Sequence, residues 1–403
     1  MLAFPQALAG VIDAARPFGQ EQVPLAEAAG RVLAEAVVAD VDVPPFDTTA
    51  MDGWALRSSE VRSAPGRLAA AGAIAAGTVP PPLPARSALK VMTGAPMPDG
   101  SDAVVPVEQA AESGGEVRIY DVPVPGAHVR RRGEVLARGC VLLRPGRRLT
   151  PADLVLAAGA GRESLLVARR PTAAVLVTGD EVVPPGRPLD PGKIRNTNGP
   201  LLLAALGRLG CLAEDRGLVR DDPEQLRASL SSALSRNLDL LLTTGGISAG
   251  DWDLVGGVLA ELGADVRFHK VAIKPARPIL FATAGRTLVF GLPGNPVSTA
   301  VAFDLFVVAA VRKGWGLEPP FPGFETARLL GPARNKGGRL AFHPATLERR
   351  DGALLATPLP SKGSHDVLNH ARADGYLVLQ PDSSHEAGEG VPAYPAREGM
   401  TLG

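Results

Sequence analysis

The sequence has very little cysteine and no excess of charge of either sign. Its two cysteines, Cys140 and Cys211, are too few and too scattered for a disulfide framework or a zinc site. The 42 basic and 42 acidic side chains give a formal net charge of zero, which argues against a protein that binds nucleic acid or a membrane surface. A membrane span needs about 18 to 20 continuous apolar residues, and the chain has no such run. The N-terminus has no signal-peptide pattern, so we expect a cytoplasmic protein.

The chain has enough residues for several domains, since 403 residues exceed the usual size of one hydrophobic core. Apolar residues at helical spacing predict helices over residues 4–15 and 25–38. Short β-like runs at 88–92, 103–107 and 117–124 then predict a small β-rich domain. Helix is expected again over 151–158, with Thr150 as N-cap and Pro151 at the first helical position.

From Pro171 onward, apolar runs alternate with helical patterns. Strands are predicted at 173–178, 212–219, 238–244, 265–273, 279–282 and 287–291. This alternation is typical of an α/β domain with a doubly wound parallel sheet and helices on both faces. After Pro319 only short β-like runs are expected, including one at 366–369, which predicts a C-terminal β-barrel without helices.

A glycine-rich turn follows the strand predicted at 238–244. Strand, glycine-rich turn and helix N-terminus together form an arrangement that binds anions, because free backbone N–H groups and the helix dipole favour negative charge. An ordinary strand-to-helix turn explains this loop alone equally well. The candidate binding residues of the loop are Gly245, Gly246, Ser248 and Gly250.

Other predicted strands also end in polar or special residues. Ligands of an open parallel sheet bind at the carboxyl ends of the strands, so we expect these loops to converge. Carboxylates there suit Mg²⁺, which accepts one or two of them together with phosphate oxygens. Helix capping is the alternative role, favoured for Asp251 and equally plausible for Asp221. The strand-end segments are 179–181, 221–222, 245–253, 274–275 and 293–296, and their candidate oxygen ligands are Glu181, Asp221, Asp251 and Asp253.

Two lysines flank the expected crevice. Lys270 and Lys274 are four residues apart, which on one strand places both on the same face. Lysine is a compact charge suited to a phosphate or another oxyanion. Two solvated charges on an edge strand are the alternative explanation.

A set of motifs that spans most of the chain resembles the molybdopterin molybdenumtransferases, which include the gephyrin E domain. The motifs are MDGWA (51–55), KVMTGAPMPDGSDAVVPVE (90–108), RRRGE (130–134), TGDE (178–181), TTGGISAGDWD (243–253), KVAIKPARP (270–278), GLPGNPVS (291–298) and KGSH (362–365). The resemblance implies an enzyme that inserts molybdate into adenylated molybdopterin and releases AMP with Mg²⁺. It also implies a homodimer whose site combines the α/β and last domains of one subunit with the inserted domain of the other.

The resemblance also implies domain boundaries and site residues. The domains are a helical one from the two flanks 1–43 and 138–170, an inserted β-rich domain over 44–137, the α/β domain over 171–318 and the barrel over 319–403. Catalytic candidates are Asp52, Thr93, Arg130, Glu181, Asp253, Lys270 and Lys274. Candidates for binding the pterin substrate and the oxyanion are Gly245, Gly246, Ser248, Gly250, Arg277, Pro293, Gly294, Asn295 and Ser364. Candidate metal ligands are Glu181, Asp221 and Asp253.

The sequence departs from the family pattern at a few of these motifs. Val135 stands where the family usually has an acid, and Pro344 where it has an arginine. These changes leave open a gephyrin-like scaffold that binds partners and has lost the reaction. A short enzyme that adenylates molybdopterin is the other alternative, and the long N-terminal half argues against it. The retained acids and lysines favour the transferase, with a molybdopterin-adenylating enzyme and downstream molybdoenzymes as possible partners.

Overall fold

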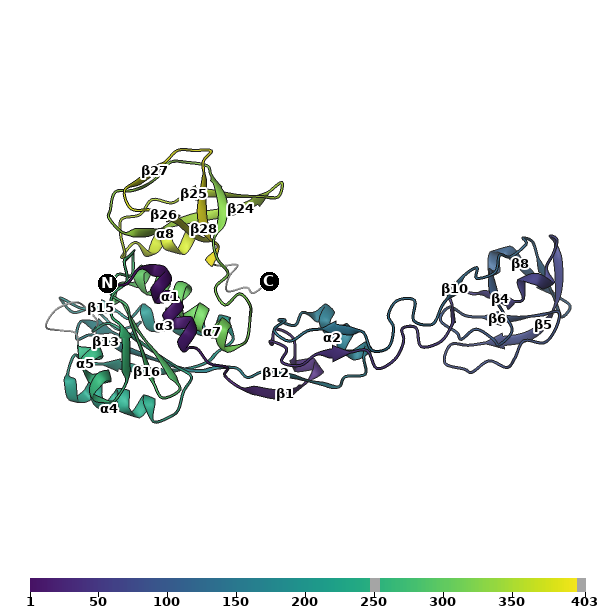
Figure 1. Cartoon of the computed structure of the whole chain (residues 1–403), viewed down its shortest axis with the longest axis horizontal. Helices are drawn as coiled ribbons and strands as arrows, with labels where there is room; N and C mark the ends of the chain where they lie inside the picture. Colours follow the sequence, from purple (N-terminus) through teal and green to yellow (C-terminus); the bar gives the residue numbers. More distant parts are fainter. Residues whose placement is uncertain (247–253, 397–403) are drawn as a thin grey trace.

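The computed structural model describes residues 1–246 and 254–396. The protein is elongated (Figure 1). The α/β domain and the C-terminal barrel lie together at one end, the small β-rich domain lies at the other, and a narrow connection joins them. None of the helices in the described ranges is both long and apolar enough to cross a membrane.

The α/β domain is built on a six-stranded sheet in the order β16-β13-β17-β21-β20-β18. The first four strands in this order are parallel, whereas β20 and β18 run antiparallel to their neighbours. The fully parallel sheet expected from the sequence is therefore wrong at one edge, because the short turn at Gly285-Arg286 makes β20 and β21 a hairpin. The strands are β13 (Thr172–Thr178), β16 (Leu212–Val219), β17 (Leu240–Thr244), β18 (Asp265–Phe268), β20 (Leu280–Ala284) and β21 (Thr287–Leu292).

Helices cover both faces of this sheet, which confirms the doubly wound architecture. Alternate residues of β13 face two separate hydrophobic clusters: Val175 and Val177 join one, and Ala174 and Leu176 join the other. The first cluster is covered by α1 (Phe4–Ala14), α3 (Asn198–Leu209), α6 (Pro296–Ala302), the π-helix η4 (Phe303–Val307) and α7 (Val308–Gly314). The second is covered by α4 (Pro223–Leu234) and α5 (Leu254–Glu261).

The connection between the two ends is formed by both flanks of the inserted domain. The helix predicted over 25–38 is wrong, because this segment has only one turn of 3₁₀-helix, η1 (Leu25–Glu27), before β2. Val32 and Leu33 are buried and form bridges to Arg148 and Val167, so long-range pairing overrides the helical pattern. The remaining elements are β1 (Gln20–Pro24), β2 (Val37–Val38), β11 (Val141–Leu143), α2 (Pro151–Gly159) and β12 (Ser164–Ala168).

The predicted N-terminus of α2 is confirmed. The Thr150 hydroxyl accepts a hydrogen bond from the Asp153 N–H at 3.3 Å, and the Asp153 carboxylate accepts one from the Thr150 N–H at 2.8 Å. This reciprocal capping box satisfies backbone donors at the start of the helix.

The inserted domain is a six-stranded sheet in the order β7-β4-β6-β5-β9-β8, as the β-like runs predicted. A two-stranded ribbon of β3 (Thr48–Thr49) and β10 (Val129–Arg130) lies next to the connection. The sheet strands are β4 (Gly53–Leu56), β5 (Gly66–Ile74), β6 (Ser87–Val91), β7 (Ala103–Pro106), β8 (Ala110–Ser113) and β9 (Glu116–Ile119), with 3₁₀ turns η2 (Ser58–Glu60) and η3 (Val107–Gln109).

The C-terminal domain is the predicted barrel, closed by pairing of β24 with both β25 and β26. The short helix α8 (Val367–Arg372) replaces the strand predicted at 366–369, since the Asp366 side chain accepts from the Asn369 N–H as an N-cap. The strands are β22 (Glu325–Leu329), β23 (Ala333–Asn335), β24 (Leu340–Arg350), β25 (Ala353–Pro358), β26 (Gly375–Leu379), β27 (Ser383–His385) and β28 (Gly390–Tyr394).

The α/β domain contributes one strand to the barrel. The single strand predicted over 265–273 is wrong: β18 ends at Phe268, and the separate strand β19 (Ile273–Lys274) pairs in parallel with β24. Lys270 and Lys274 therefore do not share one strand face. β19 therefore joins the α/β domain to the barrel, beside the cavity that lies between them.

Candidate functional site

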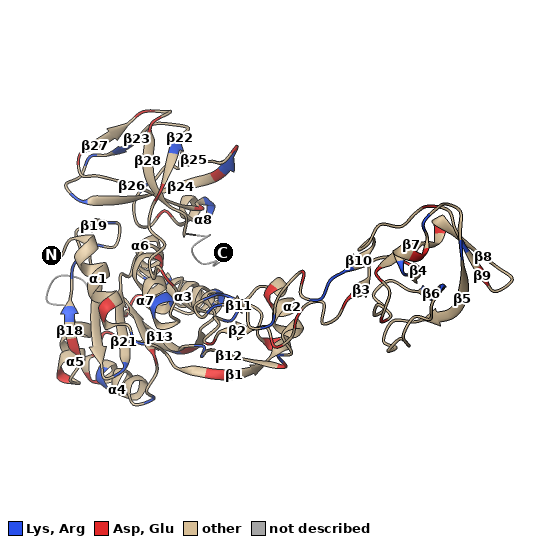
Figure 2. Ribbon diagram, turned by 45° about the vertical axis from the view of Figure 1, so that its right-hand side comes forward, with Lys and Arg blue, Asp and Glu red and all other residues tan. Residues whose placement is uncertain are grey.

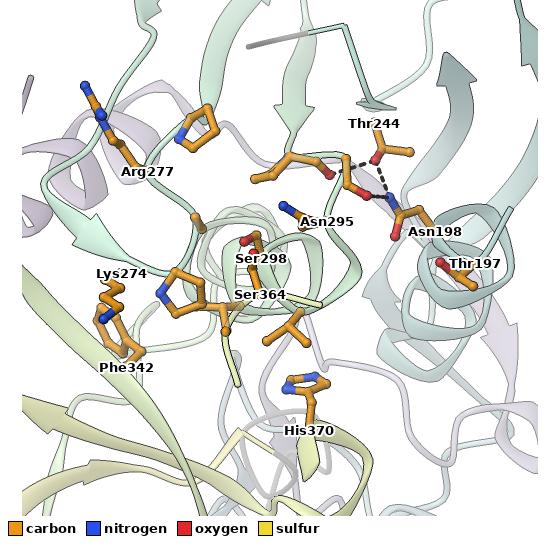
Figure 3. Close-up of a pocket in the computed structure, with 18 of the residues that line it drawn as sticks. Thr197, Asn198, Thr244, Lys274, Arg277, Asn295, Ser298, Phe342, Ser364 and His370 are labelled. Carbon is orange, nitrogen blue, oxygen red and sulfur yellow. Dashed lines mark hydrogen bonds between the residues drawn. The ribbon is translucent and has the colours of Figure 1, made fainter. Parts of the chain in front are cut away.

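A cavity of about 860 Å³ lies between the carboxyl edge of the α/β sheet and the barrel. Loops that follow β13, β17 and β21 form one wall, and residues of β23, β24, β26 and α8 form the other. Figure 3 shows Lys274, Asn295 and Asn198 from the α/β domain around the same space as Phe342, Ser364 and His370 from the barrel. The predicted convergence is thus observed for the described parts of the segments 179–181, 245–253, 274–275 and 293–296, whereas 221–222 does not line the cavity.

Two glycines let the backbones at the floor of the cavity approach closely. Gly245 and Gly246 have φ values of +90° and +62°. A Cβ on Gly245 would lie 2.3 Å from the Thr178 carbonyl oxygen, so no larger residue fits without displacing β13. The other candidates of this loop, Ser248, Gly250, Asp251 and Asp253, lie outside the described residues.

A hydrogen-bond network joins three of the loops. The Asn198 side-chain N–H groups donate to the Thr244 hydroxyl and to the Gly294 carbonyl, both at 2.8 Å, and the Thr244 hydroxyl donates to the Pro293 carbonyl at 2.9 Å (Figure 3). Asn198 and Thr244 are buried, so the network holds the loop ends in one arrangement. Neither residue was identified from the sequence, because an isolated Asn or Thr at a strand end carries no distinguishing pattern.

The barrel brings one predicted residue to the start of α6. The Val297 N–H donates to the Ser364 carbonyl at 3.3 Å, and Figure 3 shows the Ser298 and Ser364 side chains in the middle of the cavity. Gly294 and Asn295, also predicted, line the same region. Two hydroxyls from different domains are therefore available to one ligand group.

Cations predominate along the cavity. Among the described lining residues, one is acidic, Glu181, and six are lysine or arginine. A concave site with this imbalance attracts an anionic ligand, although the whole chain is neutral. Only Lys274 and Arg277 were predicted from the sequence. The other four lie in none of the sequence motifs. The six are Arg195, Lys274, Arg277, Arg334, Lys336 and Arg339.

The segment between Lys274 and Arg277 has an unusual backbone. Ala276 is buried and has a φ of +70°, a left-handed conformation that costs a non-glycine residue about 1 kcal/mol. Such strain clusters at functional sites, where surrounding structure holds it. Lys270 does not line the cavity, and its carbonyl accepts a hydrogen bond from the Leu2 N–H at 3.0 Å.

The predicted metal ligands within the described residues are two neighbouring acids. Glu181 lines the cavity and Asp221 does not. Burial raises the pKa of Asp221, and the nearby Glu181 and Asp180 carboxylates raise it further. Within residues 1–246 and 254–396, no group of three or more His, Cys, Asp or Glu side chains is arranged to hold a metal ion. The two acids form a like-charged pair whose repulsion a cation would relieve.

A histidine in the barrel wall of the cavity, His343, was also not predicted from the sequence. The His343 ring Nε2 lies 2.8 Å from the Leu359 carbonyl oxygen, and burial lowers the pKa of His343, with Lys274 contributing in the same direction. Pro344, next to it in β24, lines the cavity where the sequence pattern anticipates an arginine.

Comparison with known proteins assigns this architecture to a family. Three family models match: "MoeA N-terminal region (domain I and II)" over residues 2–161, "Probable molybdopterin binding domain" over 174–313, and "MoeA C-terminal region (domain IV)" over 326–396. A molybdopterin molybdenumtransferase from Haemophilus influenzae is 33% identical over 94% of each chain. The chain belongs to the molybdopterin molybdenumtransferase family. A member from Synechococcus elongatus is 44% identical over 72% of this chain and 74% of its own.

Solved structures of the family share the fold. The crystal structure of the molybdopterin biosynthesis MoeA protein from Pyrococcus horikosii superposes with a TM-score of 0.85 and 33% identity, covering 98% of this chain and 99% of that one. The architecture expected from the resemblance is therefore confirmed at family level. The relatives give no support to the scaffold alternative.

Three predicted site residues of this family lie far from the cavity. Asp52, Thr93 and Arg130 belong to the inserted domain, at the opposite end of the elongated molecule (Figures 1 and 2). Asp52 accepts hydrogen bonds from the Thr93 hydroxyl at 2.7 Å and the Thr93 N–H at 2.6 Å, and these bonds lower the pKa of Asp52. Asp52 and Thr93 thus form a local unit that a single chain does not bring to the cavity.

Proposed function

We propose that the protein inserts molybdate into adenylated molybdopterin and releases AMP. The observation that carries this proposal is the cation-rich cavity between the sheet edge and the barrel, which suits a large, multiply anionic substrate. Family membership supports the same reaction, since the relatives are named molybdopterin molybdenumtransferase.

Molybdate is a tetrahedral dianion, and the centre of the cavity offers groups that receive it. Lys274 supplies positive charge, and the Ser298 and Ser364 hydroxyls supply hydrogen-bond donors. The turn at Gly245 and Gly246, with the Pro293–Asn295 loop beside it, would receive the pterin and its phosphate. Arg277 lies at the same wall, and Ser248, Gly250 and Asp253 are proposed to complete the loop.

The Mg²⁺ implied for this reaction fits the acids on the sheet edge. Glu181 and Asp221 are oxygen donors of the kind that Mg²⁺ prefers. Burial is the main cause of the raised pKa of Asp221, and the nearby carboxylates, whose like charge Mg²⁺ would offset, raise it further. Asp253 is proposed as a further ligand. When bound, Mg²⁺ neutralises charge on the phosphates and stabilises the leaving AMP. Glu181 and Asp221 would hold the ion at the sheet edge.

We propose a cytoplasmic homodimer in which the inserted domain of one subunit completes the cavity of the other. The separation of Asp52, Thr93 and Arg130 from the cavity of their own chain supports this arrangement. Lys270 is proposed as an outer cation beside the cavity. The proposed domains are a helical one formed by 1–43 and 138–170, the inserted β-rich domain 44–137, the α/β domain 171–318 and the barrel 319–403. A molybdopterin-adenylating enzyme would deliver the substrate, and molybdoenzymes would receive the product.

A complementation experiment tests the chemistry and the shared site together. Lys274→Ala and Asp52→Asn are each expected to abolish AMP release. In a homodimer of either variant both sites are defective, because Lys274 belongs to the cavity and Asp52 to the inserted domain that completes it. Subunits mixed after unfolding and refolding should recover about a quarter of the wild-type rate, since half of the dimers then contain one intact site. Lys313→Ala, at the surface end of α7, is the matched control and should keep full activity. Recovery of no activity would refute the shared site, and full activity of Lys274→Ala would refute the chemistry.

A further inference from the structure

Two arginines lie close together where the connection meets the α/β domain. Arg148 follows β11 in the connection, and Arg312 lies in α7 of the α/β domain. The turns beside them touch, because a Cβ placed on Gly146 would lie 3.0 Å from the Gly316 carbonyl oxygen. Burial lowers the pKa of Arg148, and the charge of the nearby Arg312 lowers it further. Two like charges at such a place repel each other unless an anion lies between them.

Each side chain of this arginine pair has a buried nitrogen without an acceptor. Nη1 of Arg148 and Nε of Arg312 form no hydrogen bond with any described residue. Arg312 donates from Nη2 to the Pro319 carbonyl at 3.2 Å, and burial lowers the pKa of Arg312 as well. A buried charged donor without a partner is costly, and nothing in the described part of the chain offsets that cost here.

The cations next to the arginine pair in the sequence are matched with acids. Arg147 lies 2.9 Å from the Asp153 carboxylate, and Lys313 lies 3.2 Å from the Glu318 carboxylate. Neither arginine of the pair forms a salt bridge with a residue that the structure describes. The acids on both sides are therefore already used by other cations.

The backbones that carry the arginine pair are fixed. Arg148 forms a β-bridge with Val32, and the Leu317 N–H donates to the Arg312 carbonyl at 3.0 Å. Val32 and Leu317 are buried in one hydrophobic cluster, which joins the two segments. The helix dipole favours a cation in the last turn of α7, which accounts for Arg312 alone and leaves Arg148 unexplained.

The arginine pair is separate from the cavity between the sheet edge and the barrel. Ser298, which lines that cavity, and Arg312 belong to one continuous helical run formed by α6, η4 and α7. At about 1.5 Å per residue, roughly 20 Å of helix axis separates the two residues. Neither arginine of the pair lines the cavity.

We propose that Arg148 and Arg312 bind a phosphate dianion at the junction of the connection with the α/β domain. Two guanidinium groups offer paired N–H donors to the oxygens of one tetrahedral anion. A phosphate group carries a charge of about −1.5 to −2 near pH 7, which balances two cations, whereas a carboxylate balances one. Both side chains are partly exposed, so a free anion can reach them from solvent. The bound phosphate holds the connection against α7, and this role does not depend on the proposed reaction.

The test is thermal unfolding of the full-length protein at pH 8 in sodium phosphate and in sodium chloride of equal ionic strength. Once phosphate exceeds its Kd about tenfold, the melting temperature of wild type should be roughly 2 to 4 °C higher than in chloride. Arg148→Gln and Arg312→Gln should each lose most of this rise, because losing a charge-assisted hydrogen-bonded partner weakens binding by about ten- to a hundredfold. Arg147→Gln is the matched control and should keep the rise, since Asp153 already balances that charge. Phosphate also stabilises proteins without binding, and that part is common to all variants.

The order of stability in the two salts separates binding from a purely structural role. Removing one of two repelling charges should leave Arg148→Gln at least as stable as wild type in chloride and less stable than wild type in phosphate. A residue with only a structural role would lower the melting temperature equally in both salts. Lys274→Ala removes a cation from the cavity and should keep the rise.

Three results would overturn the proposal. Equal melting temperatures of wild type in the two salts would mean that the site does not exist. A rise of unchanged size in Arg148→Gln and Arg312→Gln would exclude the arginine pair, and its loss in Lys274→Ala would place the phosphate in the cavity instead. An equal rise with sodium acetate would show that the arginine pair accepts a carboxylate and does not require a dianion.

Discussion

Replacing Asp304 by asparagine should change how the stability of the protein depends on pH. Asp304 is buried in the π-helix η4, and its carboxylate accepts a hydrogen bond from the Tyr376 hydroxyl of the barrel at 2.7 Å. Tyr376 lines the cavity, and its ring stacks on that of His370. Burial raises the pKa of Asp304 from 3.8 to about 7, although the Tyr376 hydrogen bond and the charge of Arg208 lower it. The carboxyl group therefore connects the α/β domain to a wall of the cavity.

The sign and size of the effect follow from the raised pKa. Between the unfolded pKa and the folded pKa the native protein holds a proton that the unfolded chain has lost, so stability falls as pH rises through this window. At about 1.4 kcal/mol per pKa unit, the whole rise corresponds to about 4 kcal/mol. The part of it that lies between about pH 5 and pH 8 is about 2 to 3 kcal/mol.

The assay compares urea unfolding of wild type and Asp304→Asn across this pH range. The asparagine does not ionise, so its stability relative to wild type should rise by about 2 to 3 kcal/mol from pH 5 to pH 8, while other groups titrate equally in both proteins. Tyr376→Phe removes a bond that lowers the pKa of Asp304, so the loss of stability should continue to higher pH than in wild type. Parallel pH profiles for wild type and Asp304→Asn would refute the reasoning.

Three further changes should have distinct effects. Gly245→Ala places a Cβ 2.3 Å from the Thr178 carbonyl in a left-handed conformation, so it should lower stability by about 1 to 3 kcal/mol and abolish AMP release; an unchanged melting curve would contradict this. Thr150→Ala removes the N-cap of α2 and should cost about 1 kcal/mol by urea unfolding with the rate of AMP release unchanged. Glu181→Gln should raise the Mg²⁺ concentration for half-maximal AMP release by about tenfold or more, and an unaltered Mg²⁺ requirement would exclude Glu181 as a ligand.

The sequence predicted the centre of the α/β domain well because the strands β13, β17 and β21 are buried on both faces and leave a strong apolar pattern. All five residues of β17 are buried, for example, and the glycines that follow allow the close approach to Thr178. Position at a strand end was sufficient to predict that Gly245 and Gly294 line one cavity, because carboxyl ends of parallel strands share one edge. Lys274 also lines the cavity, but it does so from β19, which pairs with the barrel.

Long-range pairing explains what the sequence did not predict. The break between Phe268 and Ile273 arises because β19 leaves the sheet to pair with the barrel. The bridges of Val32 and Leu33 similarly replace the helix expected there. Arg339 carries no local signal, since its place in the cavity depends on a barrel turn and on a carbonyl about 66 residues away in the chain.

The most direct test of the proposed reaction is AMP release by the purified wild-type protein. The protein would receive adenylated molybdopterin and Mg²⁺ at rising concentrations of molybdate, with tungstate in a parallel series. We predict AMP release that saturates with the oxyanion, because the cavity must bind molybdate before the adenylate is cleaved productively. Tight binding of the adenylate with no AMP release at any oxyanion concentration would contradict the account.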